Sequence, residues 1–113
     1  MIVRIWRTQI AQARAGEYRN FAHSRSLPMF RAQPGFAGVS FAAHRDERVV
    51  ITLWHDLTSA RALDHSPAYQ ATVAQIEATG FLRGQSTVEV LELEEVFVAD
   101  PTGGSDQPGA ART

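Results

Sequence analysis

Four histidines are the side chains of this sequence best suited to move protons, because imidazole exchanges a proton near neutral pH. They are His23, His44, His55 and His65. His65 stands just before a predicted helix start and is our first candidate for a general base, with His23 second. The alternatives are a cap or loop role for His65 and a role at an interface between subunits for His55.

The spacing of these histidines argues against a metal site. No His-x-His or His-x-x-x-His pair occurs, so no strand or helix offers a chelating pair. In the hairpin predicted below, His44 and His55 lie about six rungs, or roughly 20 Å, apart. We therefore expect no metal ion.

Several aromatic residues could bind a flat apolar molecule. A hairpin turn centred at Asp46-Glu47 pairs Val39 with Trp54 and Phe41 with Thr52, which places these side chains on one face of the sheet. Such a wall suits an aromatic ligand, and the alternative for each residue is ordinary core packing. The predicted substrate-binding residues are Trp54, Phe41, Thr52, Trp6, Phe21 and Tyr69.

Arg4 is the candidate cation of the site, because it shares a strand face with Trp6, whereas Arg7 faces the other way. If that face lines the pocket, Arg4 could stabilise a phenolate or peroxide anion. The alternative is that Arg4 or Arg7 pairs with a carboxylate of the last strand, which carries Glu89, Glu92, Glu94 and Glu95.

These residues must be positioned by alternating strands and helices. Short apolar runs predict strands at residues 2–10, 36–45, 49–54 and 86–99. Helical periodicity and caps predict a helix over 12–27, with Ser26 capping a short continuation past Pro28, and a helical pair over 57–64 and from Pro67 to Gly80. The order predicts an α+β, ferredoxin-like β-α-β-β-α-β fold with a split second helix and a four-stranded antiparallel sheet.

The strand at 49–54 reads Val-Val-Ile-Thr-Leu-Trp and has no polar alternation. Both faces of the sheet must therefore be covered, although helices can cover only one of them. The economical solution is a homodimer through sheet-on-sheet packing. The long last strand is expected to reach the neighbouring subunit.

Composition narrows the possible classes of protein. The 113 residues carry a net charge of −1, and the eleven basic residues are scattered arginines, so we expect no nucleic acid partner. The absence of cysteine and lysine excludes thiolate and Schiff-base chemistry. No apolar run approaches the roughly 20 residues of a membrane span, and we expect a cytoplasmic protein with no membrane partner. One domain is expected over residues 1–99, followed by a disordered tail at 100–113.

Residues 1–7 (MIVRIWR), 34–38 (PGFAG), 52–54 (TLW) and 60–63 (ARAL) resemble the dimeric α/β-barrel superfamily, and within it the antibiotic biosynthesis monooxygenase (ABM) type. The resemblance implies a homodimer with a pocket between sheet and helices. In its cofactor-independent, quinone-forming members an asparagine precedes the strand-ending tryptophan and a tyrosine follows it. Trp54 matches the tryptophan, while Val50 and Ala60 occupy the other two positions.

The superfamily also contains haem-degrading members, but Thr72 and Leu63 stand where these carry an axial histidine and a tryptophan. We therefore expect no cofactor. The predicted function is a cofactor-independent monooxygenase that acts on a small aromatic, phenolic or quinol-type substrate, deprotonated by His65 or another histidine. The alternatives are a dimer that binds a small apolar molecule without catalysis, and a structural dimer with a vestigial pocket.

Overall fold

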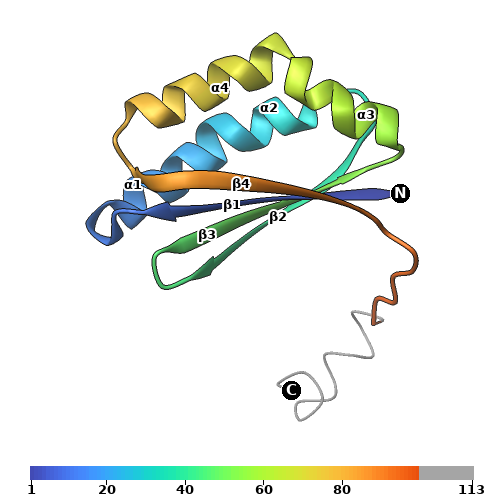
Figure 1. The fold of residues 1–113 in the computed structure, drawn as a ribbon, viewed down its shortest axis with the longest axis horizontal. Coiled ribbons are helices and arrows are strands. Elements are labelled where there is room, and N and C mark those ends of the chain that lie inside the picture. Colours follow the sequence, from blue (N-terminus) through green and yellow to red (C-terminus); the bar gives the residue numbers. More distant parts are fainter. Residues whose placement is uncertain (100–113) are drawn as a thin grey trace.

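The computed structural model describes residues 1–99 as a four-stranded sheet with helices on one face (Figure 1). The predicted tail at 100–113 lies outside the described residues. The elements in chain order are β1 (Ile2–Ile10), the 3₁₀-helix η1 (Gln12–Arg14), α1 (Ala15–Phe21), the π-helix η2 (Ala22–Ser26), α2 (Leu27–Arg31), β2 (Phe36–His44), β3 (Glu47–Trp54), α3 (Leu57–Ala62), the 3₁₀-helix η3 (Leu63–His65), α4 (Pro67–Ala78) and β4 (Leu82–Glu92).

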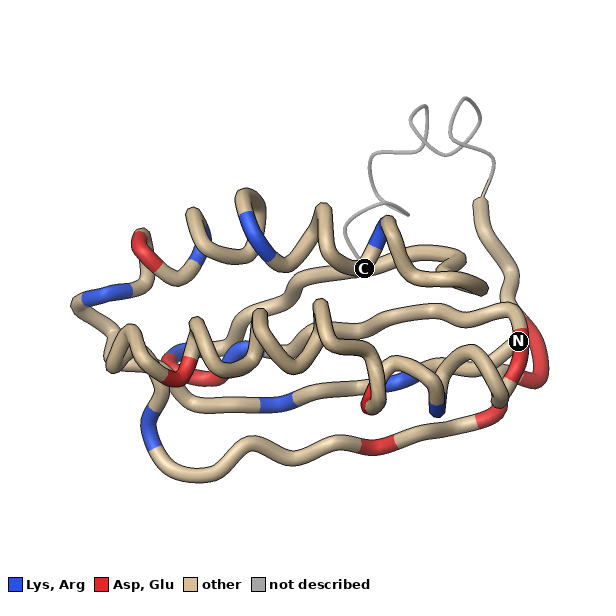
Figure 2. The backbone as a smooth tube through the Cα atoms, turned by 90° about the horizontal axis from the view of Figure 1, so that it is seen from above, with Lys and Arg blue, Asp and Glu red and all other residues tan. Residues whose placement is uncertain are grey.

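The strand order in the sheet is β2-β3-β1-β4, and every neighbouring pair is antiparallel. The two central strands, β1 and β3, come from opposite halves of the chain, so the sheet joins both halves. This order and the split second helix confirm the predicted ferredoxin-like fold. The arginines are spread over strands and helices rather than gathered in one stripe (Figure 2).

The first helix differs from the prediction near Pro28. Ser26 does not cap a new helix with its side chain; instead the helical path from α1 to α2 continues through η2. The backbone N–H of Leu27 donates to the carbonyl of Ala22, a five-residue step typical of a π-helix. Proline lacks an N–H to bond the preceding turn, and a local π-helical turn accommodates that loss without a break.

The register of the β2–β3 hairpin is shifted by two residues from the predicted one. Val39 pairs with Thr52 and Phe41 with Val50, and His44 pairs with Glu47 across a two-residue turn at Arg45-Asp46. The predicted pairs were wrong because the turn is shorter and lies one residue earlier, with Arg45 at φ 54°. A shift of two residues leaves the side chains from Gly38 to His44 on their predicted faces, because strand side chains alternate with a period of two. A bulge between Phe36 and Gly38 breaks the alternation and places Phe36 on the face of Trp54.

The helical pair after β3 confirms both predicted caps. The Asp56 carboxylate accepts a hydrogen bond from the backbone N–H of Ser59 at 2.7 Å. Ser66 Oγ accepts one from the N–H of Tyr69 at 3.3 Å, and Pro67 is the first residue of α4. These caps fix where α3 and α4 begin, and therefore which faces of the two helices meet the sheet.

The last strand runs from Leu82 to Glu92 rather than over the predicted residues 86–99. It ends there because β1 has ended, with Ile2 opposite Glu92 and a last backbone bond of 2.9 Å from Leu93 to Met1. Residues 93–99 follow without regular structure, and Phe97 is 90% exposed. That this segment reaches a neighbouring subunit remains a prediction.

Two apolar clusters fill the space between the sheet and the helices. The first contains Trp54, Phe30 and Leu63, and the second contains Ile10, Tyr18 and Phe81. Trp6 packs against both clusters from the centre of β1. The helix-covered face thus forms one continuous layer along the sheet, and the space around Trp6 lies in its middle.

The opposite face of the sheet carries an apolar patch that no helix covers (Figure 1). We call it the open face; its half-buried apolar residues are Val3, Ile5, Val49, Ile51 and Leu53. Leu91 extends it onto β4 and is exposed. Within residues 1–99, no helix is at once long enough and apolar enough to cross a membrane.

Gly35 allows β2 to begin against α3 and gives a test of this packing. Its φ is +79°, and a Cβ built there would overlap the side chain of Ser59. We expect Gly35→Ala to lower the free energy of unfolding by more than about 1 kcal/mol, measured by urea denaturation. Gly16→Ala in α1 is the control, because a Cβ there meets no atom within 4 Å; equal effects of the two changes would contradict this role for Gly35.

Candidate functional site

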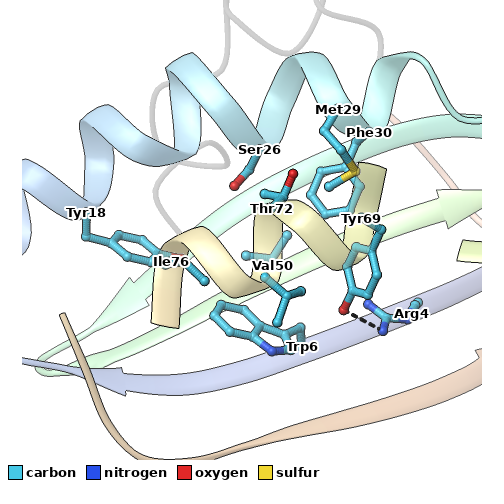
Figure 3. A pocket seen from close by; sticks show the side chains of 11 residues that line it. Arg4, Trp6, Tyr18, Ser26, Met29, Phe30, Val50, Tyr69, Thr72 and Ile76 are labelled. Carbon is cyan, nitrogen blue, oxygen red and sulfur yellow. Dashed lines mark hydrogen bonds between the residues drawn. The ribbon is translucent and has the colours of Figure 1, made fainter. Parts of the chain in front are cut away.

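A pocket opens between β1 and β3 on one side and the first helical path and α4 on the other, beside Trp6 (Figure 3). Its walls are mainly apolar, with polar groups at a few points. The lining residues are Arg4, Trp6, Tyr18, Ser26, Met29, Phe30, Val50, Tyr69, Thr72, Val73 and Ile76. The residues from α4 lie at the i, i+3, i+4 and i+7 spacing that the sequence predicts for its inner face.

The space left in this pocket is small. Its cavity volume is about 50 Å³, whereas ligand pockets in proteins commonly measure about 300–1,000 Å³. A single aromatic ring would therefore require lining side chains to move. Ser26, Met29 and Thr72 lie at the upper side of the pocket (Figure 3). Ser26 and Met29 come from the continuous path through η2 and α2, and Thr72 comes from α4, so a small separation of that path from α4 would enlarge the pocket.

Arg4 is the charged group of the pocket, and only 3% of it is exposed. Its Nη2 donates to the Asp64 carboxylate at 2.9 Å and to the hydroxyl of Tyr69 at 3.0 Å. The guanidinium carbon lies 5.1 Å from the centre of the Tyr69 ring. A buried charge needs such partners, and together they tie the centre of the sheet to the junction of η3 and α4.

The buried Nε of Arg4 has no partner among the described residues. It donates no hydrogen bond there, although a buried donor without an acceptor is costly. The hydroxyl of Tyr69 accepts from Arg4, which leaves its own O–H free to donate. The Tyr69 O–H therefore offers one donor to an oxygen atom of a ligand, and the buried Nε of Arg4 would offer a second once lining side chains move to admit that ligand.

Tyr18 closes the other end of the pocket and carries no charge at physiological pH. Burial raises the pKa of its hydroxyl to about 12, and the positive charge of Arg48 opposes this rise only in part. The guanidinium carbon of Arg48 lies 5.9 Å from the centre of the Tyr18 ring. Tyr18 thus contributes a neutral ring to the pocket wall.

Trp54 and Thr52, predicted to bind substrate, lie in the core rather than on the pocket wall. Trp54 is fully buried, with 0% exposure, and its Nε1 donates to Thr52 Oγ1 at 2.8 Å. Thr52 Oγ1 in turn donates to the backbone carbonyl of Arg4 at 3.4 Å. This chain of bonds links the strand-ending tryptophan to the residue that carries the buried charge.

The other predicted aromatic residues lie at different places. Phe21 packs edge-to-face on Phe81, with ring centres 6.4 Å apart, in the second core cluster. Phe41 is 36% exposed and lies near His23, with ring centres 6.2 Å apart, in a separate hollow described below. Neither lines the pocket beside Trp6.

Neither candidate base lines that pocket. His65 is exposed at the end of η3, directly after Asp64, and His23 is exposed on η2. Of the predicted site residues, Arg4, Trp6 and Tyr69 line the pocket. The sequence analysis did not identify Asp64 as a site residue. Its position at a helix junction could not reveal its contact with Arg4, because that contact depends on the junction lying over β1.

Within residues 1–99, no three His, Asp or Glu side chains are grouped to hold a metal ion.

The bond between Trp54 and Thr52 gives a test of how the site is supported. Thr52→Val keeps the side-chain shape but leaves the buried indole N–H without an acceptor, so we expect a loss of about 1–3 kcal/mol in the free energy of unfolding. Thr52→Ser, the control, keeps the hydroxyl and loses one methyl group, worth about 1 kcal/mol. Urea denaturation compares the two; a Val variant as stable as wild type would rule out this bond as a support.

No family model matches this chain, and no curated protein sequence matches it. Solved structures do. SnoaB, a cofactor-independent oxygenase from Streptomyces nogalater, has 18% sequence identity and a TM-score of 0.69, over 84% of this chain and 94% of SnoaB. Rv0793 from Mycobacterium tuberculosis has 18% identity and a TM-score of 0.67, over 84% of this chain and 96% of its own.

A third similar structure is ActVA-Orf6, a monooxygenase of Streptomyces coelicolor in complex with Nanaomycin D. It has 14% identity and a TM-score of 0.70, over 88% of this chain and 92% of its own. The chain therefore shares the fold of SnoaB, Rv0793 and ActVA-Orf6, and this is the ferredoxin-like arrangement that its sequence predicts.

Proposed function

We propose that this protein is a cofactor-independent monooxygenase acting on a small phenolic or quinol-type aromatic molecule. The observation that carries the proposal is the buried Arg4, whose Nε has no acceptor among residues 1–99 and which lines an otherwise apolar pocket. An aromatic ring with one oxygen atom matches this combination of apolar wall and fixed cation.

In the proposed complex the substrate ring lies between Trp6 and the side chains of Phe30 and Ile76, with its oxygen toward Arg4 and Tyr69. The guanidinium N–H and the tyrosine O–H donate to that oxygen. Both donors are held in place before the substrate arrives, by Asp64 and by α4, so little reorganisation is needed when negative charge develops.

The reaction starts with loss of a proton from the phenol or enol, which leaves an anion stabilised by Arg4. The carbanion form of this anion gives electrons to O₂, and a carbon–oxygen bond forms to give a peroxide anion. This anion takes back the proton lost in the first step and becomes a hydroperoxide. Loss of water then leaves a carbonyl group. One oxygen atom enters the product and the other leaves as water, and the substrate supplies all the electrons, so no cofactor is required.

The base for the first step remains a prediction. His65 follows Asp64 directly, and Asp64 contacts Arg4, so a change at the η3–α4 junction could bring its imidazole toward the pocket. His23 lines the neighbouring hollow, and Tyr18 borders both spaces. An already acidic phenol could instead lose its proton to water, with Arg4 holding the anion.

Two of the similar structures support this proposal. SnoaB is described as a cofactor-independent oxygenase, and ActVA-Orf6 as a monooxygenase with Nanaomycin D bound. The second candidate is a binder of a small apolar molecule without catalysis. The small cavity and the positions of His65 and His23 outside its lining favour this candidate.

Oxygen uptake tests the enzyme. With anthrone as the substrate, we expect the wild-type protein to consume one O₂ for each anthraquinone formed. Arg4→Gln and Tyr69→Phe should lower the rate at least about tenfold, because each removes a donor at the developing anion. His65→Ala, His23→Ala and Trp54→Ala test the predicted base and support.

Arg31→Gln is the control, because Arg31 is exposed on α2 and outside the pocket lining. No uptake, together with a rise of the melting temperature on adding anthrone, would favour the binder. No uptake and no rise would favour the structural dimer, and uptake unaffected by Arg4→Gln would overturn the role of that arginine.

We also propose that the protein is a homodimer joined through the open face of the sheet. The half-buried Val49, Ile51 and Leu53 support this, because an apolar patch on the surface of a sheet marks an interaction site. Sedimentation equilibrium should give twice the chain mass of 12.4 kDa. Ile51→Glu should give monomers, and Ala62→Glu, an exposed position on α3, should not; a wild-type monomer would sink the proposal.

A further inference from the structure

A second hollow lies between the first helix and the β2–β3 hairpin. Its cavity volume is about 130 Å³, larger than that of the pocket beside Trp6. Its chemically distinctive lining residues are Tyr18, Arg19, His23, Phe41 and Arg48, and the remaining ones are Ala15, Ala22, Ala42 and Ala43. The small side chains of these alanines leave the hollow open.

Arg48 is the unusual residue of this hollow. It is only 9% exposed, yet within residues 1–99 it forms no ion pair. Its Nη1 donates to the backbone carbonyls of Arg45 at 2.7 Å and Glu47 at 2.9 Å. Buried arginines are normally paired with a carboxylate, as Arg4 is with Asp64.

The two carbonyl bonds hold the guanidinium in one orientation and use only one of its nitrogens. The other N–H groups donate to no described residue and are not buried from solvent. A planar guanidinium held in this way presents a fork that matches the two oxygens of a carboxylate. Arg48 is thus held in an orientation that suits an anion, and no carboxylate among residues 1–99 pairs with it.

The rest of the hollow strengthens the positive field. Arg19 adds a second cation, and none of the lining residues is acidic. Tyr18, between Arg48 and the pocket beside Trp6, stays neutral because burial opposes its ionisation. Two cations beside apolar walls give a positive potential that attracts anions.

Two aromatic rings also line the hollow. The rings of His23 and Phe41 have centres 6.2 Å apart and are inclined by 37°. Such rings pack against a flat apolar group. The volume is close to the roughly 150 Å³ in which a cavity can hold benzene.

We infer that this hollow binds an aromatic carboxylate, with its carboxylate on Arg48 and Arg19 and its ring against Phe41 and His23. The site is separate from the pocket beside Trp6, and Tyr18 forms the wall between them. Binding here does not depend on the monooxygenase activity proposed above.

Benzoate is the probe, because it has one ring and one carboxylate. Titration of the full-length protein, followed by amide chemical shifts, should move signals of residues 15–23 and 41–48. Benzamide, which has the same shape and no charge, should bind at least about tenfold more weakly. Inorganic phosphate, an anion with no ring, should also bind more weakly than benzoate.

Arg48→Gln should weaken benzoate binding at least about tenfold and leave benzamide binding unchanged. Arg19→Gln, at an exposed position, should weaken it about threefold and serves if Arg48→Gln does not fold. Arg31→Gln, which removes one exposed charge from α2, is the control and should change nothing. Equal binding of benzoate and benzamide, equal binding of benzoate and phosphate, or shifts centred on Arg4 would each overturn the inference.

Discussion

Helices cover one face of a four-stranded sheet, and this arrangement decides what nearly every strand residue does. Side chains alternate along a strand, so even-numbered residues of β1 enter the helix-covered layer while odd-numbered ones remain on the open face. Trp6 joins the two apolar clusters of that layer, and Arg4 lies two residues before it. The same alternation places Arg7 on the other face, where it pairs with Glu89 at 3.0 Å.

Two buried arginines give the covered layer its chemistry, and they differ in their partners. Arg4 is neutralised by Asp64 and supported by Tyr69, both through Nη2, and its buried Nε has no acceptor among residues 1–99. Arg48 is held by backbone carbonyls alone. A charge taken from water needs compensation, so the unused donors of both residues mark the places where a ligand oxygen would stabilise the protein as well as bind to it. Tyr18 lies between these places and borders both.

The open face and the segment after β4 are two parts of the described chain where apolar side chains are not covered by helices. Five half-buried aliphatic side chains share the open face, and the segment after Glu92 exposes Val96, Phe97 and Val98. The segment after Glu92 begins next to the open face, because β4 pairs with β1 and Leu91 lies opposite Val3. The homodimer proposed above would cover the open face, whereas the pocket and the hollow lie on the helix-covered side.

The sequence by itself determined the fold, because the order of apolar runs and the caps at the starts of the helical pair, Asp56 and Ser66, are local signals. It also determined which face the strand residues occupy, except beyond the bulge at Phe36, since the two-residue error in the hairpin register leaves faces unchanged. Strand ends and ion pairs were decided by tertiary structure: β4 stops where β1 offers no further partner, and Asp64 meets Arg4 across 60 residues of chain. Trp54 kept its predicted face yet became core, because only packing of the helices decides which inward residues border a space and which fill it.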